Sequence, residues 1–213
     1  MTRFTDLLQP AAGTALMSRW LTGTAARSRA AAAAVSEEWA AAPSPPGRLS
    51  QHILLSLDGT GLLFYAQWTS DDAHLTWARA HRDNVVSRVD TLVPAIQRPG
   101  LHRTRLARSV IHDPDRPAEL FTVTTLAAHD VDAALVPRPG LLATHVHLTP
   151  DRRHAHLVRE WADAASPDDN TRIGGHDTGP YTLLHALVDG TRRELPRTEA
   201  ESAMCIPEQG QHV

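Results

Sequence analysis

The sequence predicts an α+β fold made of two tandem copies of one small sheet-forming unit. Three observations carry this prediction: alternating strand and helix patterns over residues 12–113, a linker-like composition at 112–117, and a later run of strand patterns that repeats the first at a fixed spacing. The chain has 213 residues, 42% of them hydrophobic, which is enough for packed cores. We expect domains at residues 12–113 and 117–192, and a C-terminal tail at 193–213.

The first unit contains four expected strands and two expected helices. An alanine-rich helix fits residues 24–42, because alanine loses little entropy in a helix, and the prolines that follow end it. Ser70 can cap a second helix that runs to about Leu92. The Asp58-Gly59 pair predicts a hairpin turn, because glycine accepts positive φ. The expected strands cover residues 14–21, 48–57, 62–68 and 101–111.

The order of these elements is strand, helix, strand, strand, helix, strand. It is the ferredoxin-like pattern, in which two helices cover one face of an antiparallel sheet. The second unit repeats the first hairpin without a gap: Gly47 aligns with Gly140, His52 with His145 and Trp68 with Trp161. The repeat indicates duplication. The second unit is reduced, with strands at 119–126 and 181–188, a short helix at 131–136, and a polar, glycine-rich stretch at 167–179 where the long helix would be.

Composition excludes several classes of protein. Net charge is −3 and no long basic stripe occurs, so a nucleic-acid partner is not expected. No segment has the apolar length of a signal peptide or a membrane span. The single cysteine, Cys205, cannot form an internal disulfide. We therefore expect a soluble cytoplasmic protein that does not bind membranes.

The expected second helix places polar and aromatic side chains along one edge of its apolar face. At 100° per residue these side chains fall within an arc of about 80°. Strand alternation places Phe64 and Trp68 on one face of the sheet. If that face meets the helix, the two enclose a cleft suited to a flat apolar ligand; the alternative is an ordinary amphipathic helix. The edge residues are His74, Trp77, His81, Asn84 and Arg88.

The run from Leu57 to Ala73 (LDGTGLLFYAQWTSDDA) resembles the antibiotic biosynthesis monooxygenase family. The resemblance implies a dimeric α/β-barrel fold, which the two units of this chain would close within one molecule. It also implies oxidation of an aromatic, anthrone-type polyketide by molecular oxygen without a cofactor. Trp68 matches the family's pocket tryptophan, His74 stands at a tyrosine position, and Arg88 at an arginine position. The family's asparagine is replaced by Phe64.

On this resemblance the expected catalytic residues are His74, His81, Arg88 and Trp68, and the expected substrate-binding residues are Trp77, Phe64, Asn84 and His52. A histidine would take a proton from the substrate, because imidazole titrates near neutral pH. Arg88 would stabilise the enolate or a peroxide anion. Trp68 and Trp77 would stack on the rings and could donate through their indole N–H groups.

The second hairpin carries four histidines at alternate positions. With the register of the first hairpin, His147 opposes His156, and the four share one face. The resemblance to the family fold implies that this face points into the barrel. The histidines are candidate metal ligands, although ordinary barrel-lining residues are the favoured interpretation, because no carboxylate or cysteine joins them. The four residues are His145, His147, His154 and His156.

Two other functions remain open from the sequence. A non-catalytic barrel that binds a small molecule is the main alternative, and Phe64 favours it. A haem-degrading or metal-dependent relative is a weaker one; Trp77 and His81 resemble part of the haem-degrading set. The expected partners are a small aromatic substrate and oxygen, with the chain a monomer or a homodimer.

Overall fold

The computed structural model describes residues 9–163, 176–188 and 191–194. Its helical segments are three α-helices, one π-helical turn and two short 3₁₀ segments: α1 (Ala25–Ala41), α2 (Asp71–Trp77), η2 (Ala78–Arg82), α3 (Asp83–Leu92), η3 (Ala128–Asp130) and η4 (Asp132–Leu135). The strands are β1 (Thr14–Leu21), β2 (Arg48–Ser56), β3 (Gly61–Trp68), β4 (Leu101–Ile111), β5 (Leu120–Ala127), β6 (Leu141–Leu148), β7 (His154–Trp161), β8 (His176–Val188) and β9 (Thr191–Glu194).

The strands form one large antiparallel sheet that closes on itself. Its order is β2-β3-β1-β4-β6-β7-β5-β8-β9, and β2 also pairs with β8. The strands of the first half run in the order β2-β3-β1-β4, and those of the second half in the equivalent order β6-β7-β5-β8. The β4–β6 and β2–β8 pairings join the halves, which leaves the ring without a free edge between them.

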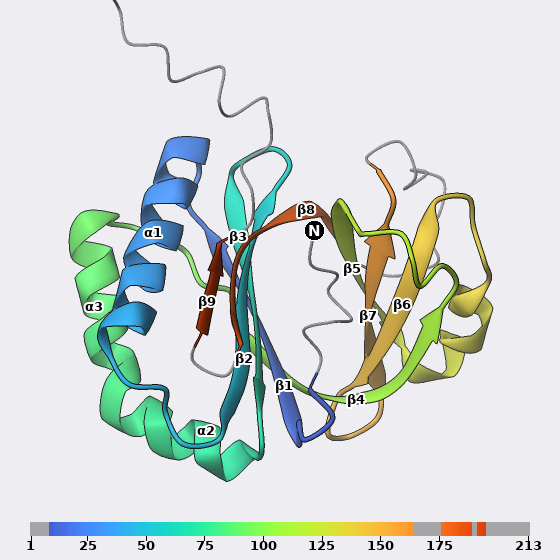
Figure 1. Ribbon diagram of the computed structural model, residues 1–213, viewed down its shortest axis with the longest axis horizontal. Coiled ribbons are helices and arrows are strands. Elements are labelled where there is room, and N and C mark those ends of the chain that lie inside the picture. Colours follow the sequence, from blue (N-terminus) through green and yellow to red (C-terminus); the bar gives the residue numbers. More distant parts are fainter. Residues whose placement is uncertain (1–8, 164–175, 189–190, 195–213) are drawn as a thin grey trace, which may run out of the picture.

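Helices α1 to α3 cover the outer face of the first half of the sheet (Figure 1). Val35 of α1 and Val89 of α3 pack against Ile53 and Leu62 of the hairpin in one buried cluster. The opposite face points into the closed ring, where a second cluster contains residues from both halves, such as Tyr65 and Phe121. The first-half sheet therefore has an outer face under helices and an inner face against the second half.

The two hairpins share their detailed geometry at the spacing of 93 residues found in the sequence. Arg48 pairs with Trp68 and Leu141 with Trp161, and a register shift follows both pairs. At the tips, the Ser56 hydroxyl donates to the Asp58 carboxylate, as the Thr149 hydroxyl does to Asp151, at 2.6 Å in both cases. Equivalent hydrogen bonds thus form at equivalent positions in both halves.

Most expected elements of the first half are present. Thr24 and Ser70 cap their helices through side-chain oxygens, and the strands agree within about a residue. The expected continuous helix after Ser70 is interrupted by the π-helical turn η2. A π-turn shifts the phase of the residues that follow it, which periodicity does not reveal.

The second half departs more from expectation. The short helix expected at 131–136 is two 3₁₀ segments, and the last expected strand begins at His176 rather than 181. Residues 193–194, expected at the start of the tail, lie in β9. The expected loss of the second long helix falls at 164–175, outside the described residues, as do the last residues of the tail.

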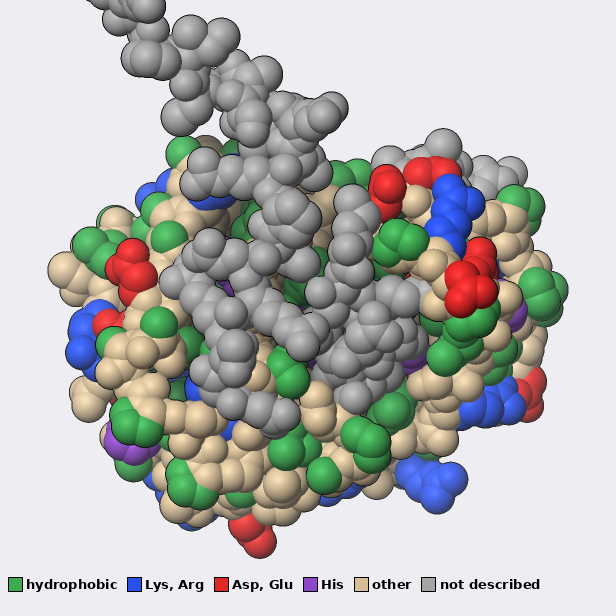
Figure 2. Space-filling model, in the orientation of Figure 1, with side chains coloured by type: hydrophobic (Ala, Val, Ile, Leu, Met, Phe, Trp, Pro, Cys, Tyr) green, Lys and Arg blue, Asp and Glu red, His purple; other side chains and the backbone are tan. Residues whose placement is uncertain are grey.

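Charged side chains are dispersed over the face shown in Figure 2, among hydrophobic and other side chains. Within the described residues, no helix combines the length and the apolarity needed to cross a membrane.

Candidate functional site

A cavity of about 230 Å³ lies between the outer face of the first-half sheet and the helices; we call it the sheet-side cavity. Strands β1 and β3 supply its floor, because alternate residues of each strand face the helices. Helices α1 to α3 and the start of β4 supply its walls. Its lining includes Leu16, Trp20, Trp39, Phe64, Trp68, His74, Trp77, Val85 and Arg98.

Aromatic rings form much of this lining. Phe64 packs between Trp20 and Trp39, with ring centroids 4.5 and 6.3 Å away. Trp68 lies against Trp77, at a centroid distance of 5.6 Å. The ring of Phe64 makes this part of the wall apolar. The arrangement suits a flat aromatic ligand.

A larger cavity of about 770 Å³ adjoins the first, between the end of α1, the loop after it, and α2 to α3; we call it the helix-side cavity. The two cavities share Trp39, Trp77 and Val85 in their walls. A ligand that lies along Trp77 can therefore contact both.

The structure divides the expected stripe of the second helix between these cavities. His74 precedes the π-helical turn and lines the sheet-side cavity, whereas His81, Asn84 and Arg88 line the helix-side cavity. Trp77 lines both. The phase shift at η2 explains the division, since the expectation of one shared cleft assumed a regular α-helix.

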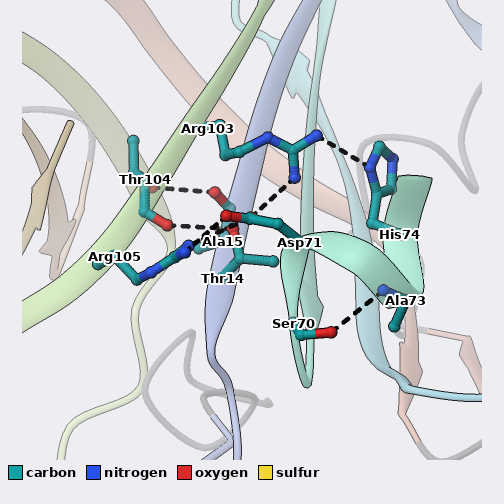
Figure 3. A network of polar contacts seen from close by, with 9 residues as sticks. All are labelled: Thr14, Ala15, Ser70, Asp71, Ala73, His74, Arg103, Thr104 and Arg105. Atoms are coloured by element: carbon teal, nitrogen blue, oxygen red, sulfur yellow. Dashed lines mark hydrogen bonds and ion pairs between the residues drawn. The ribbon is translucent and has the colours of Figure 1, made fainter. Parts of the chain in front are cut away.

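The side chain of His74 is buried and makes one hydrogen bond within the described residues. Its Nδ1 lies 3.2 Å from a terminal nitrogen of Arg103, on β4 (Figure 3). Burial first, and the Arg103 charge second, lower the pKa of His74 from 6.5 to about 4. His74 is therefore neutral at pH 7.

Asp71 holds Arg103 and Arg105 at the start of α2. Arg103 donates to one carboxylate oxygen at 2.9 Å, and Arg105 donates to both oxygens, the shorter contact being 2.6 Å (Figure 3). The hydrogen bond from Arg105 is the main cause that holds the pKa of Asp71 well below its usual range. The carboxylate is therefore ionised and fixes the guanidinium that contacts His74.

The indole N–H of Trp68 is buried and has no hydrogen-bond partner among the described residues. Its counterpart in the second half, Trp161, donates to the Thr122 hydroxyl at 2.9 Å. Thr122 on β5 pairs with Arg159, and Leu16 on β1 pairs with Ala66, which are equivalent register positions. Leu16 thus stands where Thr122 would, and it offers no acceptor.

Arg88 forms an ion pair with Glu38 of α1 at 3.0 Å, and its side chain is 63% exposed. The pair lies in the lining of the helix-side cavity, which also includes His81 and Asn84. An exposed ion pair of this kind contributes little to stability, so Arg88 can exchange Glu38 for an anionic group of a ligand at small cost.

His52 lines neither cavity. It is fully buried on the inner face of the sheet, with its ring 5.5 Å from that of Tyr65. Strand alternation explains the placement: His52 and Trp68 lie on opposite faces, so a role for His52 in substrate binding has no geometric support.

The histidines of the second hairpin also lie on this inner face, and His147 opposes His156 as expected. His145 does have a carboxylate neighbour, because its Nε2 lies 3.0 Å from Glu160; the expectation that none joins the histidines is wrong. His154 is exposed at the start of β7. Among the described residues, no three histidine, cysteine or acidic side chains are placed to hold a metal ion.

Several residues of the site were not expected from the sequence, among them Trp39, Arg98, Asp71 and Arg103. Trp39 follows Val35 by one helical turn, so helical spacing could have placed it in the cleft. Arg98 stacks on Trp20 at 4.1 Å from the ring centroid, but it lies in a loop without periodicity. Asp71 and Arg103 meet only in the folded chain, across 32 residues of sequence.

No protein-family model and no curated protein sequence matches the chain. Its fold resembles those of several solved structures, two of which are described next. One is an anthrone oxidase-like protein, 16% identical, with a TM-score of 0.63; the match covers 86% of this chain and 96% of that one. The other is a candidate monooxygenase from Fusobacterium nucleatum, 10% identical, with a TM-score of 0.52 and coverage of 88% and 100%. At these identities the likeness shows the fold: α+β, with a large antiparallel sheet.

Proposed function

We propose that this chain is a cofactor-independent monooxygenase that oxidises an aromatic, anthrone-type compound with molecular oxygen. The observation that carries the proposal is the aromatic-walled sheet-side cavity beside two side chains with N–H groups, Trp68 and His74. The fold it shares with an anthrone oxidase-like protein supports the same conclusion. We further propose that the two halves are ferredoxin-like units from a duplication, closed into one α/β-barrel, with the site in the first.

The proposed reaction needs no external reductant. The substrate's ring CH₂ loses a proton to give an enolate, which passes an electron to O₂. The two radicals combine to a peroxide anion, which takes the proton back, and loss of water from the hydroperoxide leaves a carbonyl. One oxygen atom enters the product and the other leaves as water. His81 takes the proton, because the Nδ1 of His74 already accepts from Arg103. Arg88 stabilises the anionic intermediate from the helix-side cavity.

Oxygen consumption with anthrone, together with quinone absorbance, tests this function. Native protein should consume one O₂ per quinone formed, with or without a chelator. Trp68→Phe and Arg88→Ala should lose most of the rate, roughly tenfold or more, because each removes a group beside the substrate.

Two control variants make the test specific to the first half. Trp161→Phe changes the equivalent tryptophan of the second half, and Arg79→Ala removes an exposed arginine of η2 that lines neither cavity. Both should keep the native rate. Loss of rate in the controls, or a rate that disappears with chelator, would contradict the proposal.

The second candidate function is binding without turnover, which Phe64 favours because it replaces the family's polar asparagine with an apolar ring. In that case anthrone would quench tryptophan fluorescence without consuming oxygen. Phe64→Asn would then be the first variant in which to look for oxygen consumption.

A further inference from the structure

We propose that Arg103 holds His74 as a neutral imidazole protonated on Nε2, so that His74 and Trp68 together offer two N–H donors to one acceptor oxygen of a ligand. The inference deepens the proposed function and rests on it for the ligand, an aromatic ketone or its enolate. It assigns Arg103 as a positioning residue and gives His74 the role of donor instead of base.

The first step concerns which ring nitrogen of His74 carries the proton. A guanidinium has donors and no acceptor, so Nδ1, which lies 3.2 Å from Arg103, must be the unprotonated nitrogen. The proton of the neutral ring is then on Nε2. A protonated ring would place an N–H against the guanidinium and a second positive charge beside it.

The second step concerns what holds Arg103 in place. Asp71 accepts from Arg103 at 2.9 Å and from Arg105 at 2.6 Å, and Asp71 is itself fixed at the first turn of α2, where Ser70 caps the helix. His74 is three residues further along the same helix. The positions of the donor, Arg103, and of the acceptor, His74, are thus fixed by strand β4 and the short helix α2 (Figure 3).

The third step concerns the free donors. The Nε2 of His74 makes no hydrogen bond within the described residues, and neither does the buried Nε1 of Trp68. Both rings line the sheet-side cavity, with centroids 5.3 Å apart. A buried N–H without a partner is costly, so a ligand oxygen that accepts from it gains the full hydrogen bond. The pair therefore selects ligands with a carbonyl or enolate oxygen.

A binding experiment without turnover tests the selectivity. Anthraquinone and anthracene share a ring skeleton and differ in the oxygens, and neither is a substrate for the proposed oxidation. Tryptophan fluorescence should show anthraquinone binding roughly tenfold tighter to the native protein. Equal affinity, or no binding of either compound, would overturn the donor pair, whereas oxygen consumption with anthrone decides the proposed function separately.

The second half provides a matched pair of variants. Leu16→Thr places a hydroxyl where Thr122 satisfies Trp161, so the Trp68 donor acquires an internal partner and the preference for anthraquinone should fall severalfold. Leu16→Val has the shape of threonine without the hydroxyl. The difference between the two variants therefore reports the hydrogen bond and not the lost volume; an identical preference in both would count against a role for the Trp68 donor.

Nitrogen-15 NMR of histidine-labelled protein tests the tautomer directly, with His74→Asn to assign the signal. At pH 7 His74 should show a protonated Nε2 and an unprotonated Nδ1. Arg103→Met should give a mixture of tautomers, and Arg103→Lys, which also only donates, should restore the native signal in part. A protonated Nδ1 in native protein, or an unchanged signal in Arg103→Met, would overturn the role of Arg103, even if all variants remain folded.

Discussion

At the scale of single residues, Asp71 connects the fold to the site, because it holds both Arg103 and Arg105. Asp71→Asn should lower the free energy of unfolding by about 1 kcal/mol, since a partly buried carboxylate loses two charged donors and surrounding water offsets part of the loss. Denaturation in urea would measure the change. Asp72→Asn is the matched control, because Asp72 lies in the same helical turn without an ion pair among the described residues.

The stability that Asp71 contributes should depend on pH. The folded-state pKa of Asp71 is depressed, so its contribution is present above the unfolded pKa of about 3.9 and is lost as pH falls through the folded value. The stability difference between native protein and Asp71→Asn should therefore narrow below pH 4. A difference that persists unchanged in strong acid would mean that shape, and not charge, explains the role of Asp71.

The sequence predicts the aromatic residues of the site better than the charged ones. Trp68 and Trp77 follow from strand alternation and helical spacing, both of which are local. Arg103 does not, because β4 carries polar residues on both faces, so no pattern tells which face meets the helices. Its contact with His74 spans 29 residues and exists only once β4 lies beside β1.

At the scale of elements, the tip of the first hairpin packs against the first turn of α1. Gly59 has φ of +72°, and a Cβ there would lie 2.7 Å from the Cβ of Ala25. Gly59→Ala should destabilise the fold by about 2–3 kcal/mol, from the left-handed backbone and the clash together.

Gly23 separates these two causes. It has φ of +87°, and nothing lies within 4 Å of an added Cβ. Gly23→Ala should cost about 1 kcal/mol, from the backbone alone. Thermal and urea unfolding of both variants would test the contact. Equal losses in the free energy of unfolding would show that the hairpin tip does not pack tightly against α1.

Element boundaries in the first half follow from local chemistry, which is why they could be predicted. Thr24, Ser70 and the Asp58-Gly59 turn act through hydrogen bonds to their own neighbours. The π-helical turn at Ala78–Arg82 could not be predicted in the same way, since nothing in its sequence is foreign to an α-helix. In the second half, β8 begins in a polar stretch at His176, where pairing with β5, and not its own composition, extends the strand.

At the scale of the whole molecule, the interior of the closed sheet contains buried neutral histidines. Burial is the main cause that lowers the pKa of His52 and of His147 to about 3, and that of His156 to about 4. These folded-state values lie below the unfolded value of about 6.5, so the unfolded chain binds protons first as pH falls. The histidines therefore do not reduce the free energy of unfolding above pH 6.5, and they reduce it increasingly as pH falls toward 4. The fold should therefore lose urea resistance as pH falls below about 6.5, and the loss should continue toward about pH 3.

His147→Leu tests this origin of acid sensitivity, because leucine occupies the equivalent place, Leu54, in the first half. The variant should recover about 2 kcal/mol of the loss between pH 7.5 and 5. His129→Gln, which removes an exposed histidine, should leave the slope as in native protein. If His147→Leu also leaves the slope unchanged, the buried imidazole is not what titrates.

Closure of the sheet within one chain has a consequence for how such a protein can evolve. In a barrel closed by two identical chains, any substitution is made twice, so both pockets improve or decay together. Here Leu16 and Thr122 occupy equivalent places, yet one leaves a tryptophan N–H open and the other satisfies it. Substitutions in each half can thus be selected independently. Those in the first half can be selected for ligand binding, and those in the second half for the stability of the closed sheet.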